Sequence, residues 1–250
     1  MKSIWITGAS SGIGKALAIK FANEGWQVAA SARREDLLNK IAESNKNISS
    51  FPLDVTDGEK CKEIFGQIKN KLQSIDICFF STGTWDPKKE KDIDVDQMKK
   101  VMNVNFFGTL NCIKAVEEYF REKNSGHISI VSSIAGYRGL PNSTGYGASK
   151  AALNNLAESL YFDFGRNNVR VSLISPGFIK TQMTDKNQFK MPFLKTAEYA
   201  ANKIYNGLIN GSSFEIDFPK ELTLILKFLK ILPDNLYFKI IKKLTKYQKR

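Results

Sequence analysis

The chain has few of the residues on which metal sites, disulfide frameworks and histidine-based catalysis depend. Its 250 residues include one histidine, His127, and three cysteines, Cys61, Cys78 and Cys112, which lie far apart and show no C-x-x-C spacing. An odd number of scattered cysteines is typical of reduced thiols in the cytoplasm, not of disulfide bonds or metal ligands. A single histidine also speaks against a Ser-His-Asp mechanism. We therefore predict a cytoplasmic protein without a metal centre.

Long hydrophobic runs, linkers and internal repeats are also missing. The first apolar stretch, residues 3–6, is too short for a secretory signal because Gly8 follows it closely. The hydrophobic content of 42% and the charged content of 25% are ordinary for a soluble globular protein. A chain of this length without a linker fits one α/β domain with a large buried core.

The net charge of +12 is uneven along the chain. Residues 221–250 hold eight Lys or Arg against two acidic residues, so half of the excess lies in this tail. The rest is dilute and shows no basic stripe interleaved with aromatic residues. We therefore expect no nucleic-acid partner.

Apolar runs rich in β-branched and aromatic residues alternate with helical patterns. The predicted strands are 3–7, 26–32, 48–53, 75–81, 127–132, 169–175 and 213–218. The predicted helices are 12–24, 35–45, 57–72, 95–123 with a break, 146–167 and 196–209. Several strands lack polar alternation, as expected for a parallel sheet covered on both faces. The predicted fold is α/β, a Rossmann-like doubly wound parallel sheet of about seven strands. Ligands of such sheets bind beyond the carboxyl ends of the strands.

A glycine-rich turn separates the first predicted strand from the first predicted helix. Such a turn lets the backbone approach a pyrophosphate, and the amide groups at the helix N-terminus attract the anion. The turn predicts a dinucleotide site formed by Gly8, Ser10, Ser11, Gly12, Ile13 and Gly14.

The end of the second strand indicates which dinucleotide is bound. A carboxylate for the ribose 2′-hydroxyl is expected there in an NAD-binding fold, but the chain has Arg33 and Arg34. A guanidinium can grip a 2′-phosphate, so we predict NADP(H); solvated charges at a helix entrance are the alternative. After the third strand, Asp54 either accepts a hydrogen bond from adenine or forms a turn or N-cap.

Tyr146 and Lys150 lie four residues apart in a predicted helix, so they share one face. A neighbouring ammonium stabilises a phenolate, which lowers the pKa of the tyrosine and lets its hydroxyl exchange a proton with a substrate. On its own this spacing also fits a solvated pair on an ordinary helix.

Together the motifs closely resemble the short-chain dehydrogenase/reductase (SDR) family over residues 3–218. The matching motifs are T-G-x-x-x-G-I-G at 7–14, D-V-T at 54–56, N-x-x-G at 105–108, I-V-S-S at 130–133, Y-x-A-S-K at 146–150 and P-G at 176–177. The resemblance implies hydride transfer between a nicotinamide and an alcohol or carbonyl. It divides the chain into a dinucleotide-binding catalytic domain, 1–220, and a basic amphipathic helical extension of that domain, 221–250.

The resemblance also implies the role of each matched residue. Tyr146 is the general acid/base, Lys150 lowers its pKa and binds the nicotinamide ribose, Ser133 holds the substrate oxygen, and Asn105 anchors a proton-carrying water chain. The cofactor set further includes Val55, Gly83, Pro176, Gly177, Ile179 and Thr181. One motif departs from the family: Phe80-Ser81-Thr82-Gly83 replaces the usual Asn-Asn-Ala-Gly. The hydroxyls of Ser81 and Thr82 are candidates to replace part of the lost hydrogen bonding.

Two segments carry the predictions about substrate and partners. By resemblance, residues 183–194 form a substrate lid, and their Met and Phe residues either line an apolar pocket or pack on the domain. In the tail, 221–232 is apolar and Pro233-Asp234 opens a second helical pattern. One side of that pattern carries Leu236, Tyr237, Ile240, Ile241, Leu244 and Gln248, and the other carries Lys239, Lys242, Lys243 and Lys246. Peripheral membrane contact, packing over the pocket or on a second subunit, and disorder are the three interpretations.

The sequence thus predicts an NADP(H)-dependent reductase of a small carbonyl or secondary alcohol, with a hydrophobic or lipid-like substrate as one option. A dinucleotide-binding sensor or scaffold without catalysis, and a membrane-tethered interaction protein, are the alternatives. The resemblance implies a homodimer or homotetramer. The expected location is the cytoplasm, with membrane-surface association through 221–250 as an option.

Overall fold

The computed structural model describes residues 2–85, 93–187 and 190–245, which contain one seven-stranded sheet. Its strands are β1 (Ser3–Thr7), β2 (Gln27–Ala32), β3 (Ile48–Pro52), β4 (Ile77–Phe80), β5 (Gly126–Val131), β6 (Val169–Pro176) and β7 (Glu215–Phe218). All neighbouring strands are parallel, in the order β3-β2-β1-β4-β5-β6-β7. The chain therefore winds outward in both directions from β1 and β4, which confirms the predicted doubly wound fold.

The α-helices alternate with the strands as far as β7. They are α1 (Gly12–Asn23), α2 (Glu35–Ser44), α3 (Gly58–Leu72), α4 (Val95–Met102), α5 (Gly108–Lys123), α6 (Thr144–Gly165), α7 (Ala197–Asn210), α8 (Lys220–Lys230) and α9 (Asp234–Leu244). The predicted break within 95–123 is a π-helical turn, Asn103–Phe107, which joins α4 to α5 directly. Helix α6 begins two residues before the predicted start.

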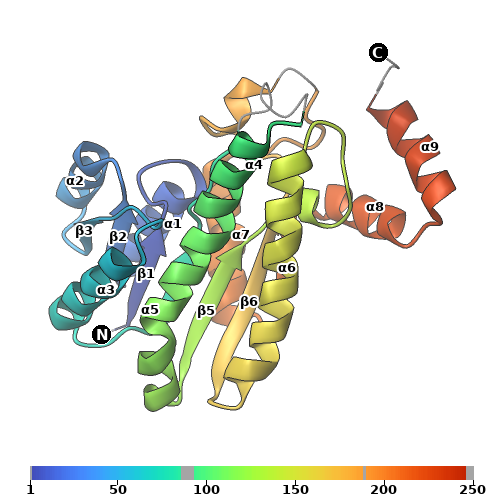
Figure 1. The fold of residues 1–250 in the computed structure, drawn as a ribbon. Coiled ribbons are helices and arrows are strands. Elements are labelled where there is room, and N and C mark those ends of the chain that lie inside the picture. Colours follow the sequence, from blue (N-terminus) through green and yellow to red (C-terminus); the bar gives the residue numbers. More distant parts are fainter. Residues whose placement is uncertain (1, 86–92, 188–189, 246–250) are drawn as a thin grey trace.

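The sheet has a hydrophobic core on each face. Ile4 and Ile6 of β1 point to the layer of α1, α2 and α7, whereas Trp5 points to the layer of α3, α5 and α6. Figure 1 shows α3, α5 and α6 on the near face. All five residues of β1 are buried, as a strand covered on both faces requires.

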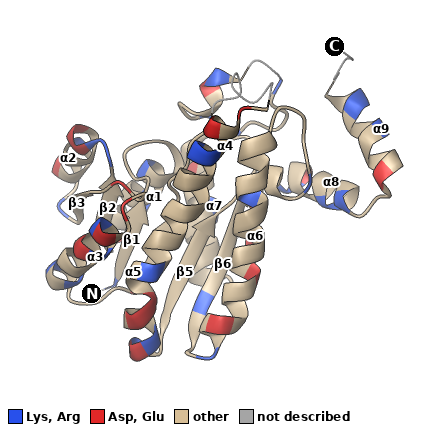
Figure 2. Ribbon diagram, viewed as in Figure 1, with Lys and Arg blue, Asp and Glu red and all other residues tan. Residues whose placement is uncertain are grey.

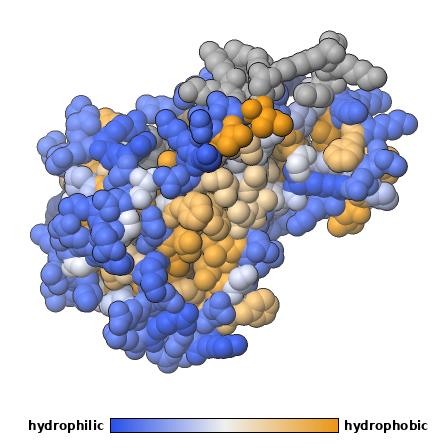
Figure 3. Space-filling model, in the orientation of Figure 1, coloured by the Kyte–Doolittle hydropathy of each residue, from blue (hydrophilic) through white to orange (hydrophobic). Residues whose placement is uncertain are grey.

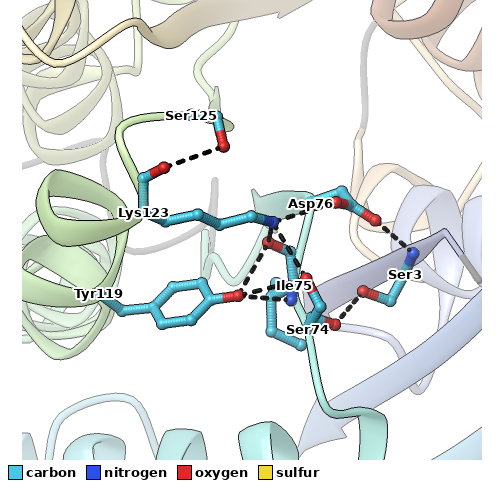
Figure 4. A network of polar contacts seen from close by, with 7 residues as sticks. All are labelled: Ser3, Ser74, Ile75, Asp76, Tyr119, Lys123 and Ser125. Atoms are coloured by element: carbon cyan, nitrogen blue, oxygen red, sulfur yellow. Dashed lines mark hydrogen bonds and ion pairs between the residues drawn. The ribbon is translucent and has the colours of Figure 1, made fainter.

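A polar network anchors the amino ends of the central strands, at the edge opposite the glycine-rich turn (Figure 4). Lys123 of α5 donates to the carbonyl of Ile75 at 2.7 Å and pairs with Asp76 at 3.1 Å. Asp76 accepts from the backbone N–H of Ser3 at 2.9 Å, and the Tyr119 hydroxyl accepts from that of Ile75 at 2.9 Å. The N–H and carbonyl of Ile75 are thus bound by side chains of α5, and β4 begins at Ile77 rather than at the predicted residue 75.

Helices α8 and α9 form an arm that extends from the sheet after β7 (Figure 1). Tyr237 and Ile241 of α9 pack with Leu229 of α8 and with Leu140. The apolar side predicted for 236–248 is therefore divided, because Leu236 and Leu244 are exposed. Lys239, Lys242 and Lys243 are exposed as predicted, and Lys246 and Gln248 lie outside the described residues. Residues 220–230 and 234–244 of the tail are helical in the structure.

Candidate active site

A cavity of about 290 Å³ lies beyond the carboxyl ends of the strands, where the strand order reverses between β1 and β4. The predicted cofactor residues all line it, together with Ser133: Gly8, Ser10, Ser11, Gly12, Ile13, Gly14, Arg33, Arg34, Asp54, Val55, Gly83, Tyr146, Lys150, Pro176, Gly177, Ile179 and Thr181. Asn105 is the predicted site residue that the cavity lining does not include.

The glycine-rich turn forms a close-fitting backbone cradle at one end of the cavity. Gly8 and Gly12 have φ angles of +71° and +55°, which glycine adopts without steric cost. A Cβ atom at Gly14 would lie 2.5 Å from the carbonyl oxygen of Gly8, so the helix can pack this closely only with glycine there. The cradle opens the N-terminus of α1, and its geometry fits a pyrophosphate.

Arg34 reaches across this cradle. Its Nη2 donates to the hydroxyls of Ser10 and Ser11 at 3.0 and 2.7 Å, and its Nη1 donates to Gln182 Oε1 at 3.1 Å. These partners are uncharged, so the guanidinium retains its positive charge beside the cavity. Arg33 Nη1 lies 3.9 Å from Asp54 Oδ2, a weak and exposed pair.

Asp54 forms a turn after β3. Its Oδ1 accepts from the N–H and the hydroxyl of Thr56 at 3.0 and 2.9 Å. The N-cap of α3 is Asp57, which accepts from the N–H of Lys60 at 2.9 Å. Of the two local alternatives raised for Asp54, the structure has the turn, while the residue also lines the cavity.

Tyr146 and Lys150 lie on one face at the start of α6, as their spacing predicts. Lys150 Nζ is 5.6 Å from the centroid of the Tyr146 ring and donates to the carbonyl of Val131 at 2.9 Å. Only 4% of Lys150 is exposed, and this burial lowers its pKa to about 8. An ammonium is therefore held beside the phenol at neutral pH. Burial and the hydrogen bond to Glu215 raise the pKa of Tyr137, so this nearby tyrosine is a poor acid.

The two serines after β5 have different tasks. Ser132 donates to the carbonyl of Lys150 at 3.0 Å and so fixes α6 against β5. Ser133 Oγ accepts from the N–H of Ala135 at 3.2 Å. Ser133 Oγ is the acceptor in that contact, and a hydroxyl can also donate its proton; the residue lines the cavity.

Asn105 is fully buried in the π-helical turn, next to the cavity wall. Its Oδ1 accepts from the N–H of Thr84 at 2.7 Å, and its Nδ2 donates to the carbonyl of Thr84 at 3.1 Å and to Ser149 Oγ at 3.0 Å. A Cβ at Gly83 would lie 3.6 Å from Asn105 Oδ1 and 3.8 Å from Lys150 Nζ. Asn105 thus fixes the backbone at 83–84, and Gly83 lies between Asn105 and Lys150.

In the unusual segment 80–83, the hydroxyls of Ser81 and Thr82 were candidates to replace lost hydrogen bonds, and one of them does so. Ser81 donates its hydroxyl to the carbonyl of Thr7 at 2.6 Å, and its N–H donates to Thr7 Oγ1 at 3.2 Å. These bonds tie β4 to β1. The Thr82 hydroxyl is buried and has no hydrogen-bond partner within the described parts of the chain. It lines the cavity and is available to a polar ligand.

Residues 2–192 match the family described as short chain dehydrogenase. The chain belongs to this family. Its relatives include an oxidoreductase of Myxococcus xanthus, 32% identical over 93% of both chains, and one of Staphylococcus epidermidis, 34% identical over 85% of this chain and 93% of that one. The shared family makes this chain an oxidoreductase that binds a nicotinamide dinucleotide and a small-molecule substrate.

Solved structures of the same fold carry different cofactors. ElxO with NADP bound has a TM-score of 0.74 and 28% identity, covering 86% of this chain and 97% of its own. A variant of ElxO in which one tyrosine is replaced by phenylalanine has NADPH bound, with a TM-score of 0.75 and the same identity and coverage. A family member from Burkholderia phymatum in complex with NAD has a TM-score of 0.78 at 20% identity, covering 90% of this chain and 92% of that one.

Some residues of this dehydrogenase site escaped the sequence-based prediction. The Trp85 ring lies 5.2 Å from the Tyr146 ring, tilted by 31°. Thr184 Oγ1 donates to the carbonyl of Ile179 at 2.6 Å and accepts from the N–H of Thr181 at 2.9 Å. Trp85 follows the predicted cofactor residue Gly83 by two positions, and this proximity in the sequence could have indicated that it lies at the site.

Two residues of the predicted substrate lid, Met183 and Thr184, line the cavity. Phe193 and Leu194 are not among the residues that line the cavity, and they are 45% and 41% exposed. Gln188 and Phe189 lie outside the described residues. Among the described residues of the lid, Met183 is the apolar one that lines the cavity.

The arm is latched to the segment that joins Ser133 to Tyr146. From that segment, Arg138 Nη1 donates to the carbonyls of Lys230 and Leu232 at 3.1 and 2.8 Å, near the end of α8. The Arg138 guanidinium also pairs with Asp234 and lies 4.0 Å from the Tyr237 ring centroid. The Tyr237 hydroxyl donates to the carbonyl of Gly139 at 2.7 Å. The arm therefore supports the backbone between two predicted catalytic residues.

Proposed function

We propose that this dehydrogenase transfers a hydride between NADP(H) and a carbonyl or secondary-alcohol substrate. One observation carries the proposal: Ser133, Tyr146 and Lys150 line the same cavity as the glycine cradle. Neither a hydroxyl pair nor a glycine turn specifies this chemistry alone. Their joint position gives the cavity a dinucleotide end and a proton-transfer end.

The cavity fits the dinucleotide in three respects. Gly14 lets α1 pack closely on the turn at Gly8, α1 presents its N-terminus, and Thr82 offers an unsatisfied hydroxyl. Arg34, with Arg33 beside it, supplies positive charge where a 2′-phosphate would bind, which favours NADP(H) over NAD(H). NADP bound to ElxO supports the same preference.

The bound nicotinamide supplies or accepts the hydride, and the side chains manage the charge on the substrate oxygen. During reduction, Tyr146 donates its proton to that oxygen and Ser133 donates a hydrogen bond to it. Lys150 stabilises the resulting phenolate, because a buried ammonium interacts strongly with a nearby anion. Asn105 holds the 83–85 backbone, and with it Trp85, against the Tyr146 side of the cavity. The Trp85 ring and Met183 make an apolar substrate the better fit.

The test is NADPH oxidation by the purified protein with aldehydes, ketones, quinones and 3-oxoacyl thioesters. We expect turnover with at least one class, a strong preference for NADPH over NADH, and loss of that preference in Arg34→Gln. Arg121→Gln, a change on the distant helix α5, is the matched control. Equal affinities of the wild type for NADPH and NADH would refute the cofactor assignment.

We also propose that the protein forms a homodimer through α5 and α6. Figure 3 shows a broad apolar area over these helices. Tyr161 and Phe162 of α6 are 50% and 71% exposed, and Phe107 at the start of α5 is 49% exposed. An apolar area of this kind on helices marks an interface. Sedimentation velocity should show a dimer for the wild type and a monomer for Phe162→Lys; a wild-type monomer would contradict the proposal.

A further inference from the structure

Helix α8 has two apolar faces, although packing on the protein body needs one. Its inner face carries Leu222 and Leu229, which are 7% and 4% exposed. Its outer face continues past the last turn of the helix. The residues of that face are Leu224, Ile225, Phe228 and Ile231, which are 61%, 47%, 60% and 77% exposed. Single exposed apolar residues are ordinary, but four large ones within eight positions form a surface that a partner covers.

Lysines lie on both helices of the arm. Lys220 and Lys230 of α8 and Lys239, Lys242 and Lys243 of α9 are exposed, and Figure 2 shows basic segments on α8 and α9. Two acidic residues lie on the arm: Glu221 is exposed, and Asp234 is paired with Arg138. Lys220 pairs with Asp217, and Lys227 turns inward to Glu215 and Asp217. Lys230, Lys239, Lys242 and Lys243 are the exposed lysines that remain. The free charge around the apolar face is therefore strongly positive.

We propose that the outer face of α8, with the lysines of the arm, docks on an anionic phospholipid surface. Apolar side chains would enter the boundary between headgroups and acyl chains while lysines contact the headgroups. Charge decides between lipid and a second copy of this chain. A two-fold contact between arms would place lysines against lysines, whereas an anionic surface complements them.

The arm has the geometry of a peripheral attachment, not of a membrane span. Within the described ranges of the chain, no helix is long and apolar enough to cross a bilayer. Helix α8 is short, and its inner face is already occupied by the protein. Figure 3 shows an apolar area at the lower edge of the arm, where α8 lies in Figure 1, separate from the area over α5 and α6. Docking therefore leaves the proposed dimer interface free.

The experiment is co-sedimentation of the full-length protein with sucrose-loaded vesicles. One set contains phosphatidylcholine alone, and the other contains phosphatidylcholine mixed with phosphatidylglycerol. We expect binding to the anionic vesicles at low salt and little binding at high salt or to the neutral vesicles. Replacing three lysines, Lys230→Gln, Lys239→Gln and Lys243→Gln, should weaken partitioning about a hundredfold.

A double variant, Phe228→Ser with Ile231→Ser, tests the apolar face, and we expect it to lose vesicle binding. Its matched control is Ile93→Ser with Val95→Ser, a similarly exposed pair outside the arm, which should bind vesicles like the wild type. Circular dichroism checks that each variant is folded. Wild-type protein that stays in the supernatant, or that binds neutral vesicles equally well, overturns the proposal. So does a change in oligomeric state of the Phe228/Ile231 variant without a change in vesicle binding, since a second copy would then cover this face.

Discussion

Replacing Lys150 with Met is expected to stabilise the cofactor-free protein while removing its activity. The folded state holds this ammonium almost completely buried, which lowers its pKa from 10.5 to about 8. The unfolded lysine keeps its proton up to a pH near 10.5. The buried charge therefore costs the folded state about 3 kcal/mol at pH 7 and about 1.4 kcal/mol at pH 9.5, from the difference in proton binding.

The methionine variant also loses one hydrogen bond, the one from Lys150 Nζ to the carbonyl of Val131. That loss costs about 1 kcal/mol. Lys150→Met should therefore be more stable than the wild type by about 2 kcal/mol at pH 7, and by only about 0.4 kcal/mol at pH 9.5. Because a depressed lysine pKa destabilises the fold below that pKa, the wild type gains stability as the pH rises from 8 toward 10.5.

The assay is urea unfolding of both proteins, followed by circular dichroism at pH 7 and pH 9.5. Titration of other groups is common to both proteins and cancels in the difference between them. A Lys150→Met variant that is less stable at pH 7, or whose advantage does not shrink at pH 9.5, would refute the buried-charge argument. The advantage, if present, would show that this lysine is retained for chemistry at a cost in stability.

Two further predictions concern the latch and the single histidine. Arg138→Gln should lower the free energy of unfolding by about 2 kcal/mol. It should also raise KM for the carbonyl substrate without changing the Kd for NADPH, because Arg138 supports the 134–143 segment and not the cradle. An unchanged KM would contradict this, and Arg138→Lys should recover part of the lost stability. Burial, with a smaller effect of Arg170, lowers the pKa of His127 to about 3, so His127 stays neutral in the fold while the unfolded state takes up a proton below pH 6.5. Through this residue the free energy of unfolding of the wild type should fall by about 2.7 kcal/mol between pH 7.5 and pH 4.5. Urea unfolding of His127→Gln should show a correspondingly smaller loss of stability over the same pH range. An equal loss in both proteins would contradict the assignment.

The fold could be predicted because its strands are buried on both faces. Runs such as 128–131 and 169–174 can be recognised as strands without knowledge of the strands beside them, because a parallel strand that is covered on both faces lacks strict polar alternation. The limits of β4 could not be predicted. Its first predicted residue, Ile75, is apolar, but the side chains of Tyr119 and Lys123, more than 40 residues later, bind its backbone.

The site followed from spacing wherever its members lie close in sequence. The cradle at 7–14 and the pair Tyr146 and Lys150 needed only local helix geometry. Contacts between segments that are distant in the sequence could not be predicted. Examples are the hydrogen bond from Arg34 to Gln182 and the contact between the rings of Trp85 and Tyr146. The tail shows the same limit. Its helical periodicity was visible, but which apolar side faces the body depends on Arg138 and Leu140, about 90 residues earlier.

The central claim is that the Tyr146 hydroxyl is the proton donor and acceptor of the reaction. Its most direct test is Tyr146→Phe, assayed for turnover and, by NADPH fluorescence, for cofactor binding, with Tyr137→Phe as the matched control. We expect Tyr146→Phe to lose turnover by at least about a thousandfold while it binds NADPH nearly as well as the wild type, and Tyr137→Phe to keep most of its activity. A Tyr146→Phe enzyme with near-wild-type rates would contradict the account.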